Sequence, residues 1–364
     1  MITALILACA LQRFGTFQQI TLYDIENGKP TMSTRMDTDP LAVPKLSPKK
    51  FGDPAIAWEF PWVISGFTED GVTPGQQALR FRVFSQARQS KGDRAPMAIR
   101  MLLRLWELNH KRLQLDHALD YNRRIVDVYL CWGGKAGGEQ LFDVDFQGET
   151  PRKVNTIYLY DLNSFTDPVE MAREMAHEYG HATLPAIGGF KEPEDWANGY
   201  LGEKIYLSYI RDEMKKGRLG PDDVMGATAE QIDKWIKTNV DPLVHEAALE
   251  GPRNDLLKES SPPMDRYLGL ALYAFRILPP AAFARSMKLT GSLNATDYAA
   301  AVAAAAEELP HYAYNVPTEL SGQAIWLPLG DGKLAGGKVL ARRDRWAKVQ
   351  PLEAKLTVTS TRSE

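Results

Sequence analysis

Two histidines that flank a glutamate constrain this chain more than any other feature. Residues 177–181 read His-Glu-Tyr-Gly-His. Side chains four residues apart lie on the same face of an α-helix, so the two imidazoles can bind one cation. Glu178 is rotated by about 100° from His177, which places its carboxylate beside the cation. The pattern is typical of a hydrolase in which a zinc ion and a carboxylate together activate a water molecule.

The residues around these histidines predict a helix over residues 169–183. Asp167 is a suitable N-cap, Pro168 suits the first helical position, and Glu170 follows the cap by three residues, as in a capping box. Apolar residues recur at helical spacing in this stretch, so one face of the helix can pack against a core. The alternative is a structural helix with one packed and one exposed histidine.

A catalytic zinc ion needs three protein ligands and an open position. Downstream, residues 193–205 predict a second helix opened by Pro193. In such a helix Glu194 and Asn198 share a face, so Asn198 can hydrogen-bond a ligand histidine. We therefore choose Glu194 as the third ligand of one Zn²⁺ per chain. Glu203, on the opposite side of that helix, and Asp195 are the alternatives.

The histidine pair followed by Glu-x-x-x-Asn resembles the gluzincin metallopeptidases over residues 155–210. The resemblance implies that His177, His181 and Glu194 bind zinc, that Glu178 is the general base, and that Asn198 supports a ligand histidine. Many gluzincins have Asp at that last position, and the interval from His181 to Glu194 is short. A metzincin is excluded, because Leu184 and Ile187 stand where its Gly and third His belong.

The resemblance implies an α+β fold with a zincin-like core, formed by a small mixed sheet and the helix that carries the histidines. A C-terminal helical lobe and a short β tail follow. The expected organisation comprises a signal segment (1–12), an extended arm (13–50), the catalytic core (51–220), the helical lobe (221–315) and the β appendage (316–364). Strands are expected at 14–23, 57–67, 78–84, 125–132 and 156–161, the last an edge or an interior strand.

The helical lobe is a candidate source of the group that stabilises the oxyanion when water attacks an amide. Helices are expected at 96–119, 229–239, 264–278, 281–289 and 295–309. Gluzincins commonly direct a Tyr or His at that oxyanion. Tyr267 is our first candidate, with His245 and His311 as alternatives, and core packing is the competing role for Tyr267. We interpret His110 and His117 as structural or exposed, because no acidic motif accompanies them.

The N-terminal residues 1–12 are apolar but too short to span a bilayer. They resemble the apolar core of a secretory signal, and Cys9 lies in a sequence similar to a bacterial lipobox. We therefore expect an extracytoplasmic protein, secreted, periplasmic or anchored by lipid at Cys9. A buried N-terminal strand, in a cytoplasmic protein, is the alternative. If Cys9 is removed with a signal peptide, Cys131 is the sole remaining thiol. We expect Cys131 to be a small buried residue.

The overall charge gives no indication of a nucleic-acid partner, and the partner expected from the zinc motif is a peptide or protein substrate. The formal net charge is −3, and 44% of residues are hydrophobic. These values are typical of a globular protein and give no reason to expect nucleic acid or an anionic membrane as partner. We expect a zinc-dependent peptidase. One alternative is a zinc hydrolase of a non-peptide bond. The other is an exported binding or scaffold protein with a structural or vestigial metal site, in which the β tail is the interaction module.

Overall fold

The computed structural model of the chain describes residues 19–37, 60, 62–69, 75–86, 94–115, 117, 125–145, 152–258, 261–290 and 294–360. The expected signal segment, Cys9 and residues 13–18 and 38–50 of the expected arm lie outside this part, so export and lipidation stay predictions. No helix within the described residues combines the length and apolar character needed to cross a membrane. Helices and a large sheet are both present, so the expected α+β class is confirmed.

The chain divides into two compact units. The first contains Met1–Asn109, Asp116–Thr183 and Tyr209–Ile232, and the second contains His110–Leu115, Leu184–Ser208 and Asp233–Glu364. The first unit holds a seven-stranded sheet with two long helices, and the second holds a set of helices and two small sheets.

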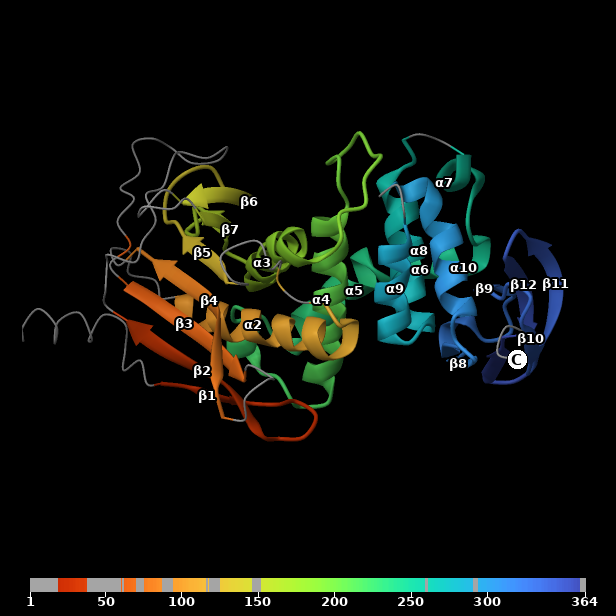
Figure 1. Cartoon of the computed structure of the whole chain (residues 1–364), viewed down its shortest axis with the longest axis horizontal. Helices are drawn as coiled ribbons and strands as arrows, with labels where there is room; N and C mark the ends of the chain where they lie inside the picture. Colours follow the sequence, from red (N-terminus) through yellow and green to blue (C-terminus); the bar gives the residue numbers. More distant parts are fainter. Residues whose placement is uncertain are drawn as a thin grey trace, which may run out of the picture. The chain divides into compact units, whose positions relative to one another are not determined.

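The large sheet has the strand order β1-β2-β3-β4-β5-β7-β6 (Figure 1). β4, β5 and β7 run parallel, whereas β6 is antiparallel to β7, so the sheet is mixed. The strands are β1 (Thr21–Tyr23), β2 (Pro30–Asp37), β3 (Trp62–Glu69), β4 (Gln77–Ser85), β5 (Val126–Leu130), β6 (Gly137–Asp145) and β7 (Arg152–Tyr160).

Two sequence expectations for this sheet were wrong or incomplete. Residues 13–50 were expected to be an extended arm, but β2 lies within them and pairs with β1 and β3 in the sheet. The expected strand at 156–161 is part of β7, which is an interior strand. The strand beyond β7, at one edge of the sheet, is β6. No expectation included β6, because its Gly-Gly-Glu-Gln start lacks the β-branched and aromatic residues typical of strands.

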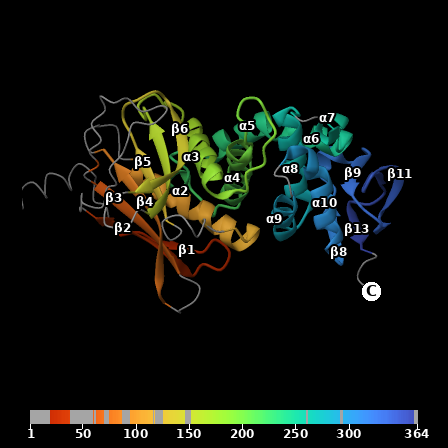
Figure 2. The ribbon, with the colours of Figure 1, turned by 45° about the horizontal axis from the view of Figure 1, so that its top comes forward.

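Two helices cover one face of this sheet. α2 (Ala95–Leu108) packs on β3 and β4, and α3 (Pro168–Thr183) packs on β6 and β7 (Figures 1 and 2). A π-helical turn (Asn109–Leu113) continues α2. It carries His110, which is exposed as expected.

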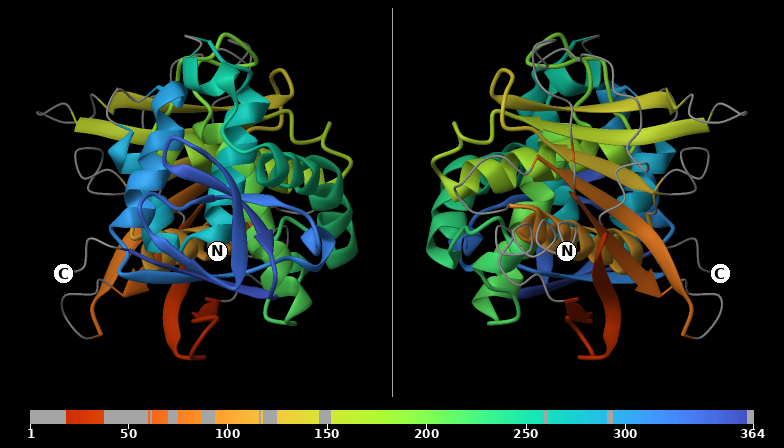
Figure 3. Two further views of the ribbon diagram at one scale, coloured as in Figure 1. Left: turned by 90° about the vertical axis from the view of Figure 1, so that its right-hand side faces the viewer. Right: turned by 90° about the vertical axis from the view of Figure 1, so that its left-hand side faces the viewer.

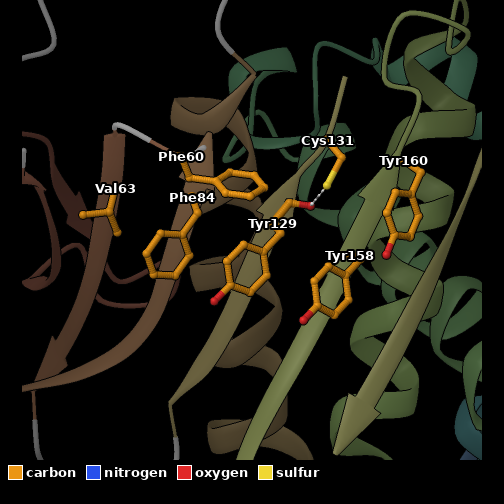
Figure 4. Close-up of a cluster of buried hydrophobic side chains, with 7 residues drawn as sticks. All are labelled: Phe60, Val63, Phe84, Tyr129, Cys131, Tyr158 and Tyr160. Carbon is orange, nitrogen blue, oxygen red and sulfur yellow. Dashed lines mark hydrogen bonds between the residues drawn. The ribbon is translucent and has the colours of Figure 1, made fainter. Parts of the chain in front are cut away.

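Aromatic side chains from neighbouring strands cover the other face of the sheet. The rings of Phe84, Tyr129 and Tyr158 stack across three strands, with centroids 4.7 Å and 5.0 Å apart (Figure 4). Phe60 meets Tyr129 edge to face. Cys131 lies buried in this cluster, and burial raises the pKa of its thiol. The expectation of a small buried residue there is confirmed.

The second unit is mainly helical before its β segments. The helices are α5 (Ala229–Asn239), α6 (Asp241–Glu250), α7 (Asn254–Lys258), α8 (Met264–Ile277), α9 (Pro280–Leu289) and α10 (Tyr298–Glu307), with α4 (Asn198–Lys215) and α5 each contributing to both units. Four of them match expected helices, and α6 and α7 were not expected.

The C-terminal strands form two three-stranded sheets, β10-β13-β8 and β11-β12-β9. Figure 3 shows these C-terminal strands in blue. The strands are β8 (His311–Asn315), β9 (Ile325–Pro328), β10 (Lys333–Ala335), β11 (Gly337–Arg343), β12 (Trp346–Pro351) and β13 (Lys355–Thr359). β11 bulges at Leu340, since Val339 pairs with Val349 and Ala341 pairs with Lys348. The Leu340 side chain is 51% exposed.

Candidate metal centre

The helix that carries the histidines begins where the sequence predicts. The Oδ1 atom of Asp167 accepts a hydrogen bond from the Val169 amide at 2.9 Å, which is the bond of an N-cap. Glu170 pairs with Arg173 at 2.9 Å. The helix ends at Thr183, whose hydroxyl donates to the Tyr179 carbonyl. Local capping therefore fixes which residues of this segment share a face.

The two histidines converge as the spacing requires. The Nε2 atoms of His177 and His181 lie 3.1 Å apart, on the same face of α3. Two nitrogen ligands at about 2.0–2.1 Å from a tetrahedral zinc ion would be about 3.3 Å apart. The observed separation therefore fits two ligands of one cation.

Glu194 lies with the two histidines in a group of three residues that could hold a metal ion. One nitrogen from each histidine and one carboxylate oxygen of Glu194 all lie within 4.8 Å of one another. No other group of three His, Cys, Asp or Glu residues in the described parts of the chain could hold a metal ion. Two His and one Glu form a donor set that suits zinc.

The two alternative carboxylates lie in other environments. Glu203 is only 3% exposed and forms an ion pair with Lys204 at 2.7 Å. Asp195 is exposed, and neither residue belongs to the three-ligand group. The geometry therefore favours the choice of Glu194.

The expected helical setting of Glu194 was wrong, because α4 begins at Asn198. Gly188 and Trp196 form a β-bridge, and the Ala197 amide donates to the Ile187 carbonyl at 2.9 Å. These bonds hold the chain before Asn198 in a hairpin-like loop, so a helix cannot start at Pro193. Glu194 is thus presented by a loop.

The structure does not test the expected support of a ligand histidine by Asn198. The Asn198 amide donates to the Leu184 carbonyl at 3.4 Å, which links the start of α4 to the residue that follows α3. A bond from Asn198 to a histidine stays a prediction.

Glu178 lies against β6, an edge strand of the sheet. Its side chain is 4% exposed. A Cβ atom built at Gly138 of β6 would be only 2.6 Å from Glu178 Cγ and 2.7 Å from Glu178 Oε1. Sequence reasoning missed Gly138, although the Gly137-Gly138 pair was a visible signal of close backbone approach.

Polar contacts tie α3 to its neighbours near the histidines. The Tyr179 hydroxyl and His117 Nε2 are 2.9 Å apart, so His117 has the structural role that we expected. The Asn155 amide of β7 donates to the Ala182 carbonyl at 3.1 Å, and the Gln140 amide of β6 donates to Asn155 at 2.7 Å. These bonds hold the end of α3 on β7 and β6.

The candidates for oxyanion stabilisation have different surroundings. Tyr267 on α8 is fully buried between the rings of Phe190 and Tyr298, and burial keeps its pKa well above the usual value. Its hydroxyl has no hydrogen-bond partner among the described residues. This environment is that of a packed core residue, and a catalytic role for Tyr267 stays a prediction. His245 is half-buried on α6, and His311 is exposed at the start of β8.

In comparisons with known proteins, no family model matches the sequence, and no curated protein or solved structure matches the chain.

Proposed function

We propose that this chain is a zinc-dependent peptidase with a zincin-like core. The observation that carries the proposal is the convergence of one ring nitrogen each from His177 and His181 and one Glu194 oxygen within 4.8 Å. Glu178 follows the first of these histidines directly. A merely structural zinc site closes with four protein ligands and needs no base, whereas three ligands leave a position for water.

In the proposed amide hydrolysis, three residues would bind zinc and a fourth would act as the general base. When bound, zinc would lower the pKa of a water molecule and polarise the scissile carbonyl. His177, His181 and Glu194 would hold the ion. The Glu178 carboxylate would take the proton from the attacking water and pass it to the leaving amine. Glu178 follows His177 directly, so it can act on the same water that the ligands position.

The sheet supports a peptide as the substrate. β6 is one of the two edge strands of the described sheet, and a Cβ atom added at its Gly138 would overlap the Glu178 side chain. An extended peptide can add to such an edge through main-chain hydrogen bonds. A peptide bound in this way would run past the base, which is an arrangement that a small non-peptide substrate does not need.

The metal content of the purified chain tests the site. We expect about one zinc ion per wild-type chain, lost in Glu194→Ala and kept in Asp195→Ala. Asp195 is the matched control, because it is an exposed carboxylate next to Glu194 in sequence. Loss of zinc in Asp195→Ala alone would identify Asp195, and not Glu194, as the third ligand. Absence of zinc from the wild type would overturn the proposal.

Hydrolysis of a peptide library tests the reaction. We expect Glu178→Gln to keep its zinc ion and to lose activity by a factor of about 10² to 10⁴, which is the usual contribution of a general base. An active Glu178→Gln protein would contradict this mechanism. Cleavage of esters or non-peptide amides, with no cleavage of peptides, would show a hydrolase of a different substrate class.

A further inference from the structure

Gly138 occupies a backbone position that does not require glycine. Its φ angle lies outside the left-handed region, whereas the preceding Gly137 has φ +142°. Gly138 pairs with Leu159 in the regular β6–β7 ladder. Glycine inside a strand usually weakens it, so backbone conformation does not explain the residue.

The space beside Gly138 provides the explanation. The three nearest atoms that a Cβ would meet are Cγ, Oε1 and Cδ of Glu178, at 2.6, 2.7 and 2.9 Å. Real Cβ atoms essentially never approach other atoms this closely, so one of the two groups would have to move. Glycine at position 138 leaves room for one particular side chain, that of the proposed general base.

The flexible Glu178 side chain is the group that would yield. A methyl group at position 138 would push the carboxylate away, since a Glu rotamer changes more easily than a paired strand moves. A base must lie within about 2.6–3.2 Å of the proton that it takes. A displacement of about 1 Å in an active site can lower the rate by a factor of about 10².

We infer that Gly138 is a positioning residue that places the Glu178 carboxylate for catalysis. The inference rests on the proposed function. Because Gly138 of β6 has no side chain, the Glu178 carboxylate has room to occupy its position beside this strand. Gly138 acts through Glu178 and has no role in metal binding.

Gly138→Ala tests the inference, with Gly220→Ala as its matched control. A Cβ at Gly220 meets open space, and the backbone there is extended, so the same chemical change should have little effect. We expect zinc-loaded Gly138→Ala to keep one zinc ion and to lose kcat by a factor of about 10² with little change in KM. Adding Gly138→Ala to Glu178→Gln should cause no further loss.

Crystal structures of the metal-free wild type and Gly138→Ala provide a readout that does not depend on activity. We expect the Glu178 carboxylate to move by about 1 Å or more. If it moves and neither protein cleaves peptides, the proposed function fails while the positional role stands. An unmoved carboxylate, or wild-type kcat in Gly138→Ala, overturns the inference. If Gly138→Ala does not fold, recovery of folding by adding Glu178→Ala supports the inference, and no recovery overturns it.

Discussion

Glu107 shows how burial changes the behaviour of a single carboxylate in this protein. It is almost fully buried on α2, accepts a hydrogen bond from the Ile25 amide at 3.0 Å, and pairs with Arg104 at 3.0 Å. Loss of hydration is the largest influence and raises the pKa of Glu107 above its usual 4.5, despite the two bonds. The folded protein therefore favours the protonated form more than the unfolded chain does.

This shift predicts a pH-dependent effect of Glu107→Gln. A carboxyl whose pKa is raised by folding stabilises the protein fully below its unfolded pKa, and this contribution is lost as the pH rises through the folded pKa. Gln cannot titrate, so the unfolding free energy of the variant should rise relative to wild type between pH 4 and pH 8. Urea unfolding at pH 4 and at pH 8 measures the unfolding free energies of wild type and variant. Glu230→Gln, on the exposed surface of α5, is the control. If Glu107→Gln and wild type differ in unfolding free energy by the same amount at pH 4 and pH 8, the raised pKa of Glu107 is contradicted.

At the residue scale, the sequence predicts which side chains could carry the chemistry, but it does not predict which distant residues contact them. His177, Glu178 and His181 are close in sequence, so helical spacing alone predicts their relation. Gly138 is distant from Glu178 along the chain, and only the packing of α3 on β6 brings the two together. Burial of Tyr267 likewise depends on Phe190 and Tyr298, which no local pattern connects to it.

At the scale of elements, helix α3 depends on its N-cap. Asp167 satisfies the Val169 amide, which no intrahelical carbonyl can reach. We expect Asp167→Ala to lower the unfolding free energy by about 1 kcal/mol, and Asp167→Asn, which keeps an acceptor, to change it by only a few tenths. Urea unfolding of the two variants measures the difference. Equal losses would show that the carboxylate charge, and not the hydrogen bond, stabilises the start of α3.

Elements with strong local signals were predicted well, and those set by tertiary pairing were not. α5 has the predicted bounds, because amphipathic spacing and good helix formers agree over its length. The start of α4 was predicted too early, since the bond from Ala197 to Ile187 competes with helix formation. β2 and β6 were missed because their pairing with other strands outweighs weak local preference.

At the scale of the whole molecule, metal binding and folding should be linked. A ligand that binds only the folded chain raises its stability by about 2.7 kcal/mol at a hundred times the dissociation constant. We therefore expect zinc to raise the Tm of the wild type and of Asp195→Ala above the value in chelator. Glu194→Ala should lose most of this increase. Scanning calorimetry measures it, and an undiminished increase in Glu194→Ala would mean that zinc binds elsewhere.

The bulge in β11 has a consequence for the protein in concentrated solution. An exposed strand edge offers unpaired amides and carbonyls as a template for aggregation with other copies. β11 interrupts this template at Leu340, and the exposed basic residues Lys338 and Arg342 lie on either side of the bulge. Bulges and positive charge are features by which natural sheets avoid such contacts. The sheet formed by β11, β12 and β9 can thus expose the edge of β11 without promoting aggregation between copies of the protein.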